Sequence, residues 1–219
     1  MSRRTIRASS LNPYIAFTDL CLNLALVFLL VIPLVMLLGN RGWDEVRYRE
    51  YQARLAAAVD GAFAGTAPPE RRPRNDAPGE QRWSFAGTTV PETELFAVRR
   101  LRSRLVETAT LTPAGKARLR AFARVLQQHR GLWHRVRIEA HTRQKSARYT
   151  GREEMASLRL SADRAAAVAQ FLFSECRIPP HRLAISGRGH QDPVDPLHKA
   201  SERNDRVDLL VISPATARR

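Results

Sequence analysis

One carboxylate stands in a long apolar segment near the N-terminus. Asp19 is the single charged residue between Arg7 and Arg41, and Asn23 follows it by four positions, which places both on one face of a helix. A carboxylate near the centre of a bilayer costs about 2.5 to 3.5 kcal/mol, so such residues usually face an ion path or a partner. We predict that Asp19 takes up and releases a proton, with Asn23 in support. The alternative is a tolerated interfacial acid, because Asp19 lies near the start of the apolar segment.

The sequence offers no other set of residues for chemistry. The six histidines are dispersed, and none has a zinc-ligand spacing with Cys or Glu. Gly187 and Gly189 indicate a turn, since the pair is too short for a phosphate-binding loop. We therefore expect no enzyme, no metal and no cofactor, with protons as the coupling ion. The histidines are His129, His134, His141, His181, His190 and His198.

A membrane-spanning helix must position this carboxylate. Residues 20–40 carry no charge, and about 20 apolar residues match the thickness of the hydrocarbon layer, so we place the span at residues 14–38. A cleaved signal peptide is the alternative, because Arg3, Arg4 and Arg7 precede the run. The run exceeds the usual length of about 7 to 15 residues and no Ala-x-Ala site follows it, which favours an uncleaved anchor. Arginines flank both ends, so the charge count does not set the orientation.

The chain is strongly basic. Its 219 residues carry a net charge of +15 with a pI near 11.3, and only three of its 36 basic residues are lysines. Such a charge can attract nucleic acid, anionic lipid or an anionic polymer. The arginines are spread over every segment, however, and no recognisable nucleic-acid module is present, so we expect no nucleic-acid partner. Cys21 lies in the predicted span and Cys176 far from it, which argues against an internal disulfide.

Composition divides the rest of the chain. Residues 39–60 are polar and alanine-rich and predict a juxtamembrane helix. Residues 61–93 contain five prolines and predict an extended linker. Residues 94–213 are expected to form one folded domain, with terminal tails at residues 1–13 and 214–219.

The folded segment alternates strands and helices. A short strand near Leu95 is followed by an arginine-rich connection. Thr112-Pro113 predicts the start of a helix, and a strand at Val136–Ala140 precedes a second long helix. Two further strands are predicted at Leu183–Ser186 and Val207–Ile212. This order predicts an α/β sandwich with the helices packed on one mixed sheet.

The membrane segment resembles that of the MotB-type stator subunits. The run Tyr14-Ile-Ala-Phe-Thr-Asp19-Leu is similar to their pattern aromatic-x-x-Tyr-Ala-Asp-Phe/Leu, and the same aspartate occurs in the ExbD/TolR energisers and in the ZorB subunit of Zorya anti-phage systems. The resemblance implies that Asp19 carries protons in a homodimer enclosed by a ring of a MotA/ZorA-like membrane partner. Partner helices are also required physically, because one helix cannot enclose an aqueous path.

Four motifs of the C-terminal segment resemble the ordered motifs of the OmpA-like peptidoglycan-binding domain. They are Val136-Arg-Ile-Glu-Ala-His141-Thr142, Leu160-Ser161-Ala-Asp-Arg164-Ala165, Arg182-Leu-x-x-x-Gly187-x-Gly189-x-x-x-Pro193 and Asn204-Asp-Arg206-Val207-Asp208. The resemblance implies a peptidoglycan site that contains Thr142, Arg164, Asn204 and Arg206, in which the guanidinium of Arg164 binds a carboxylate of diaminopimelate. His141 ends a predicted strand, and we expect it to be structural.

Position 143 departs from the family pattern. The family has an acid for the ammonium group directly after the His-Thr pair, and this chain has Arg143; Ser157 stands where an asparagine usually opens the second helix. Two neighbouring arginines would repel an ammonium and favour an anion. We therefore expect weak binding of peptidoglycan that Arg143→Asp would strengthen. Asp192 or Asp195 could supply the missing acid from the neighbouring loop.

The two resemblances together imply a proton-driven stator subunit. It would cross the bacterial inner membrane once, with a cytoplasmic N-terminus and a periplasmic C-terminal domain that anchors the complex to the cell wall. The resemblances leave open whether such a machine serves flagellar rotation, Zorya-type defence or another use. A passive envelope tether without ion transport is the alternative.

Overall fold

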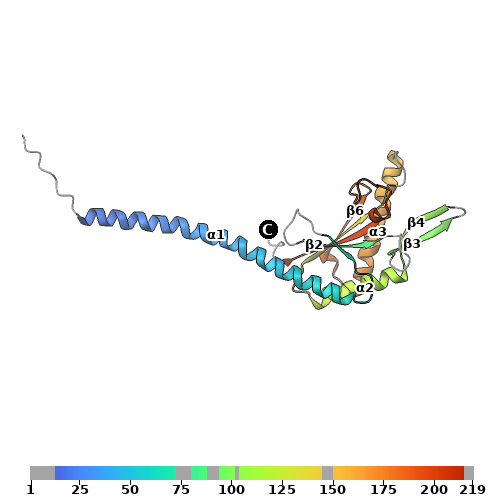
Figure 1. Cartoon of the computed structure of the whole chain (residues 1–219), viewed down its shortest axis with the longest axis horizontal. Coiled ribbons are helices and arrows are strands. Elements are labelled where there is room, and N and C mark those ends of the chain that lie inside the picture. Colours follow the sequence, from blue (N-terminus) through green and yellow to red (C-terminus); the bar gives the residue numbers. More distant parts are fainter. Residues whose placement is uncertain (1–12, 73–79, 88–93, 102–103, 145–149, 215–219) are drawn as a thin grey trace, which may run out of the picture. The chain divides into compact units, whose positions relative to one another are not determined.

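Figure 1 shows the computed structural model of the chain. The structure describes residues 13–72, 80–87, 94–101, 104–144 and 150–214. The chain divides into two compact units, Met1–Val46 and Arg47–Arg219. A long helix, α1 (Pro13–Ala62), contributes to both units. The first unit holds the apolar part of α1, and the second holds the strands of the described residues.

The apolar part of α1 is long enough to cross a membrane. Within the described residues, Phe17–Val35 is the single stretch with the required length and composition; its mean hydropathy is 2.3 and none of it is buried in the structure. Leu29 and Leu30 are 74% and 68% exposed. A helix that is apolar all round and unburied requires an apolar environment. The stretch lies inside the predicted span, residues 14–38.

A mixed sheet forms the centre of the second unit. Its five strands are arranged in the order β1 (Glu70–Arg72), β2 (Glu80–Ala86), β7 (Arg206–Ile212), β5 (Arg135–His141) and β6 (Leu183–Gly189). Only the β5–β6 pair is parallel, and the other pairs are antiparallel. The predicted strands at Val136–Ala140, Leu183–Ser186 and Val207–Ile212 are therefore confirmed.

Two helices, α2 (Pro113–Gln128) and α3 (Gly151–Ser174), pack on one face of this sheet. Alternate residues of β2 and β7 point to that face, because side chains of a strand alternate between the two faces. Trp83 and Leu209 are thus buried with Phe122 of α2 and Leu172 of α3. The predicted α/β sandwich, with its helices on one mixed sheet, is confirmed.

Side-chain caps fix where these helices begin. The Thr112 hydroxyl accepts a hydrogen bond from the Gly115 N–H at 2.8 Å, with Pro113 at the first helical position, as the sequence predicts. Thr150 and Glu153 form a reciprocal capping box at the start of α3. Each cap satisfies N–H groups that the first helical turn leaves without a partner.

The segment 61–93 differs from the predicted extended linker. It contains β1 and β2, and β2 pairs along its whole length with β7. Trp83 and Phe85 of β2 are almost completely buried, and the ring centroids of Phe85 and Phe63 lie 6.5 Å apart. The linker prediction was wrong because it weighed the prolines and overlooked the buried aromatic residues at alternate positions of β2.

The distal part of α1 belongs to the same core. α1 covers residues 39–60, where a helix is predicted, and Leu55, Val59 and Phe63 are each at most 3% exposed in the main hydrophobic cluster. Leu55 and Val59 lie about one turn apart on α1, and Phe63 follows the end of the helix at the same spacing, so the three residues continue one apolar stripe. α1 is therefore part of the folded unit from Leu55 onward and not merely a spacer.

A hairpin extends away from the five-stranded sheet (Figure 1). It consists of β3 (Phe96–Leu101) and β4 (Arg104–Leu111), which pair only with each other. The predicted short strand near Leu95 is the beginning of this hairpin, and the arginine-rich connection contributes to both of its strands. Two short 3-10 helices, η1 (Pro180–Arg182) and η2 (Glu202–Asn204), precede β6 and β7.

Candidate functional site

Asp19 and Asn23 lie one turn apart on the exposed surface of α1. The Asn23 amide donates to Asp19 Oδ1 at 3.5 Å, a long hydrogen bond that orients the carboxylate weakly. The adjacent Thr18 hydroxyl donates to the Tyr14 carbonyl at 2.6 Å, so this side chain satisfies the helix backbone. Asp19 is the third residue of the apolar stretch Phe17–Val35. The predicted pair is thus brought together, and its proton-carrying role remains a prediction.

Arg164 of α3 is buried within the second unit. Its guanidinium donates to Asp205 Oδ1 at 2.5 Å and to the Thr108 carbonyl at 3.1 Å, and Glu107 Oε2 lies 3.5 Å from Nη2. The Phe96 ring lies below it, 4.9 Å from the guanidinium carbon. The side chain is 1% exposed. Its charge is therefore neutralised by acids of the same chain.

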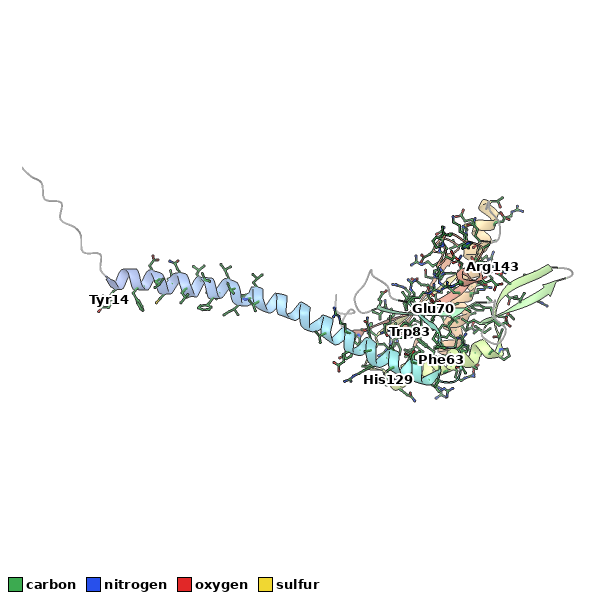
Figure 2. The ribbon with its side chains drawn as sticks, in the orientation of Figure 1. Tyr14, Phe63, Glu70, Trp83, His129 and Arg143 are labelled. Atoms are coloured by element: carbon green, nitrogen blue, oxygen red, sulfur yellow. The ribbon has the colours of Figure 1, made fainter. Side chains whose placement is uncertain are left out.

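Arg143 follows β5 and is partly exposed at the surface (Figure 2). Its two terminal nitrogens lie 3.7 Å from Glu107 Oε1 and 3.6 Å from Glu202 Oε1. Glu107 therefore lies between Arg143 and Arg164. The two arginines are accompanied by three carboxylates, which corrects the premise that they alone set the local charge. This cluster of Glu107, Arg143, Arg164, Glu202 and Asp205 is called the charge cluster below.

Thr142 and Ser157 hold the backbone beside the charge cluster. Their hydroxyls lie 2.5 Å apart and both residues are buried. The Thr142 N–H donates to the Gly189 carbonyl, and the Gly189 N–H donates to the Ser161 hydroxyl at 2.9 Å. These bonds tie the carboxyl ends of β5 and β6 to α3. Thr142, which is predicted to bind the ligand, thus also links β5 to β6 and α3.

Asn204 organises the loop between β6 and β7. Its side-chain oxygen accepts the N–H groups of Val194 and Asp195, and its amide donates to the carbonyls of Asp195, His198 and Lys199. All of these partners are main-chain groups. Asn204 is 1% exposed, so the side chain acts on the loop and presents little surface to a ligand.

Of the two acids considered as replacements, Asp195 has a carboxylate that is engaged within this loop, whereas Asp192 is held through its main chain. Asp195 accepts a hydrogen bond from the His198 N–H at 3.0 Å, and this bond lowers the pKa of the Asp195 carboxyl. The Asp192 carbonyl accepts a hydrogen bond from Arg206 at 3.1 Å. The acids that accompany Arg164 are instead Glu107 and Asp205.

Arg206, His141 and Asp208 form a buried ionic group on the sheet face opposite the helices. Asp208 Oδ2 lies 3.2 Å from Arg206 Nε and 3.3 Å from His141 Nε2. Burial lowers the pKa of His141. Although burial opposes it, the hydrogen bond from His141 and the charge of Arg206 hold the pKa of Asp208 below its ordinary value. His141 is thus structural, as expected, and Arg206 is largely held by the protein itself.

A cavity of about 290 Å³ adjoins the charge cluster. Asp205 and Glu202 line it together with Phe85 of β2 and Arg118 of α2. The backbone at position 87 lies close to Asp205, and only glycine permits this contact, because a β-carbon at Gly87 would lie 2.9 Å from the Asp205 side chain. Glu202, whose side chain is 62% exposed, is therefore the member of the charge cluster that a ligand in this cavity can reach, whereas Asp205 is buried behind it.

Sequence reasoning missed Glu107 and Asp205. Asp205 stands inside the quoted motif Asn204-Asp-Arg206, so its position was visible and its role was not. Glu107 belongs to the unpredicted β3–β4 hairpin, and no sequence pattern indicates that this hairpin returns to α3.

Residues 106–206 match the sequence model of the OmpA family. The chain carries an OmpA-like domain. Solved structures show the same fold. A MotB-like protein from Desulfovibrio vulgaris is 18% identical with a TM-score of 0.52, and the match covers 79% of this chain and 98% of that one. The cell wall anchor of the T6SS from Pseudomonas aeruginosa is 19% identical with a TM-score of 0.50, over 73% and 96% of the two chains. The search of curated proteins gave no match.

These likenesses extend beyond the segment matched by the family model. Coverage of 79% of this chain exceeds residues 106–206, so further parts of the second unit share the fold of the MotB-like protein. The folded unit that contains the OmpA-like segment is therefore larger than residues 106–206, in agreement with the burial of Trp83 and Phe85 in its core.

Proposed function

We propose that this chain is a membrane-anchored stator subunit of the MotB/ZorB type. The observation that carries the proposal is an exposed carboxylate, Asp19, within the apolar stretch Phe17–Val35 of a chain that also carries an OmpA-like domain. An unburied acid in a membrane helix needs partners that satisfy it. The fold shared with the MotB-like protein supports the same reading.

Proton transfer would act through the charge of Asp19. Protonation removes most of the cost of placing the carboxyl group in an apolar environment, so the preferred packing of α1 against partner helices changes with each proton. The partners proposed are a second copy of this chain and a ring of a MotA/ZorA-like membrane protein. The machine that they drive is flagellar, a Zorya-type defence system or another ion-driven complex.

The OmpA-like domain would anchor this complex to peptidoglycan. The wall peptide carries both carboxylate and ammonium groups, and the charge cluster offers both signs at its surface, Arg143 with a side chain 29% exposed and Glu202 with one 62% exposed. Arg164 supports the site from below. This function places the domain in the periplasm, the N-terminus in the cytoplasm and α1 in the inner membrane.

A passive envelope tether is the second candidate. Asp19 is only the third residue of the apolar stretch, where a carboxylate can reach the membrane interface at low cost. In that case, the chain would link membrane and wall without conducting protons.

Proton flux separates these candidates. The chain would be co-expressed and co-purified with a candidate MotA/ZorA-like membrane protein and reconstituted into vesicles that contain a pH-sensitive dye. We expect flux that Asp19→Asn abolishes and Asp19→Glu partly retains, because only the carboxyl groups titrate. Asp60→Asn, the same substitution at an exposed position of α1, should leave it unchanged. Flux that Asp19→Asn leaves unchanged would contradict the proton-carrying role of Asp19, and the absence of flux through the wild-type complex would support the passive tether.

A further inference from the structure

A second cavity lies where the chain leaves α2 and α3. It has a volume of about 180 Å³, and its walls include Gln127, Arg130, Trp133, Arg177, His181 and Arg182. None of these residues belongs to the charge cluster or to the quoted motifs, apart from Arg182, which opens one of them. The cavity is therefore distinct from the proposed wall-binding site.

All of its ionisable lining groups are basic. Three arginines and one histidine surround the cavity, and no aspartate or glutamate lines it. Within the described residues, none of the three arginines forms an ion pair, although Arg143, Arg164 and Arg206 elsewhere in the domain all do. Guanidinium groups that line one cavity without a counter-charge repel one another, so a bound anion would stabilise this arrangement.

The walls of the cavity are held in place. The guanidinium carbon of Arg182 lies 5.0 Å from the centroid of the Trp133 ring. Trp133 is 3% exposed, and its indole N–H donates to the Leu126 carbonyl at 2.6 Å. The Gln127 amide donates to the Cys176 carbonyl, which joins the end of α2 to the turn after α3. The Arg182 side chain therefore rests on a rigid surface. Within the described residues its guanidinium makes no side-chain hydrogen bond, so its N–H groups remain available to a ligand.

The backbone at Arg177 provides an independent indication. Its φ is +53°, and it is the only residue other than glycine with a positive φ among those that the structure describes. The next residue, Ile178, donates its N–H to the Leu172 carbonyl at 3.0 Å and closes the end of α3. Glycine is the usual residue at such a left-handed position, because it has no β-carbon to strain. The arginine found here strains the turn and lines the cavity.

We propose that this cavity binds a phosphate group. Guanidinium groups match the oxygens of phosphate in paired hydrogen bonds, and several of them together suit its double negative charge better than that of a carboxylate. A free phosphate and the phosphate of a lipid headgroup share this chemistry. The site also gives a local role to part of the net charge of +15.

Thermal unfolding of the full-length chain in maltoside micelles tests the proposal. Inorganic phosphate would be compared with chloride at equal ionic strength. At ten times the Kd, phosphate should raise the Tm of the wild type by roughly 3 to 6 °C. Arg182→Gln should abolish this response, and Arg124→Gln, an exposed arginine of α2 outside the cavity, should preserve it.

Arg177→Gly separates a ligand-binding role of Arg177 from a structural one. In chloride its Tm should equal or exceed that of the wild type, because glycine relieves the backbone, and phosphate should no longer raise it. An equal response of wild type, Arg177→Gly and Arg182→Gln to phosphate would reflect a general salt effect and overturn the proposal. The absence of a wild-type response to both phosphate and lipid would also overturn it.

A second arm identifies the source of the phosphate. Phosphatidic acid or phosphatidylcholine would be added to the micelles in phosphate-free buffer. A rise in Tm with phosphatidic acid alone that requires Arg177 and Arg182 supports a lipid headgroup. A Tm that rises only with inorganic phosphate, and only when Arg177 and Arg182 are both present, supports a soluble phosphate compound as the ligand.

Discussion

Arg164 and Asp205 form an ion pair that solvent does not reach. The nitrogen and oxygen lie 2.5 Å apart, and the two side chains are 1% and 0% exposed. The pair therefore joins α3 to the start of β7 inside the domain. The arginine for which the resemblance implies a carboxylate ligand is here paired with acids of its own chain.

Removal of the acid should destabilise the domain. Asp205→Asn leaves the Arg164 charge buried with only Glu107 nearby, and the loss of one partner of a buried ion pair costs about 3 to 5 kcal/mol. We expect a lower unfolding midpoint in urea. Asp163→Asn changes an exposed acid next to Arg164 in the sequence and should have little effect. Equal stability of the two variants would mean that Glu107 alone compensates Arg164.

Arg143 should control the binding of peptidoglycan. The sequence alone predicts that Arg143→Asp restores a missing acid and strengthens binding. From the structure we predict the opposite outcome, because Arg143 is the partly exposed cation between Glu107 and Glu202, and an aspartate there would add a further negative charge. We expect sedimentation with purified sacculi to show at least a tenfold loss of affinity, equivalent to about 1.4 kcal/mol. A gain in affinity would support the sequence-based argument instead.

Acid should weaken the domain through His141. Its folded pKa is lowered by burial, so the unfolded chain binds a proton below the ordinary value of 6.5 while the folded chain does not. Stability is therefore lost as the pH falls below that value, by up to about 1.4 kcal/mol per pH unit. The lowered pKa of Asp208 affects the stability of the fold only at much lower pH, near and below the ordinary pKa of an aspartate. Urea unfolding between about pH 7.5 and pH 5 measures this slope.

The variant His141→Asn isolates that contribution. It should flatten the pH dependence over this interval, whereas His134→Gln, at an exposed position, should leave the slope unchanged. An unchanged slope in His141→Asn would assign the effect to other groups. The overall stability of His141→Asn is a separate quantity and does not bear on the slope.

The boundary of the OmpA-like domain can be tested with fragments. The sequence predicts that a fragment from about Thr88 folds and that deletion of residues 65–78 spares the fold. The structure predicts that a fragment from Arg47 unfolds cooperatively and that one from Thr88 does not, because the shorter one lacks Trp83, Phe85 and the apolar stripe of α1. Circular dichroism during heating distinguishes the two. Phe85→Ala in the longer fragment should cost about 3 to 5 kcal/mol.

The sequence predicts those helices and strands whose determining residues lie within a few positions of one another. Thr112-Pro113 marks a helix start because the cap and the fixed φ of proline act within one turn. The strand Val136–Ala140 was visible from its alternation. β1 and β2 were missed because the surrounding prolines favoured a linker over the short aromatic alternation of β2. The partner of β2, β7, also lies at the other end of the chain, so its pairing cannot be read from nearby residues.

The candidate site could be predicted only in part for the same reason. The motifs name Arg164 and Asn204, and the structure brings both into the region of the β6–β7 loop and α3. What those side chains bind depends on residues far away in the sequence. Glu107 reaches Arg164 from the hairpin, and Asn204 is occupied by five main-chain partners, neither of which follows from the motif itself.

The packing of Leu55 in the core limits how far this protein can reach. Only residues 36–54 separate the end of the apolar stretch from the first core residue of α1. Even if fully extended, this segment spans at most about 65 Å, at about 3.4 Å per residue. If the chain has the proposed function, a wall strand bound by the OmpA-like domain must lie within this distance of the membrane, plus the size of the domain. Any greater distance would have to be bridged by partial unfolding of the domain or by a partner protein.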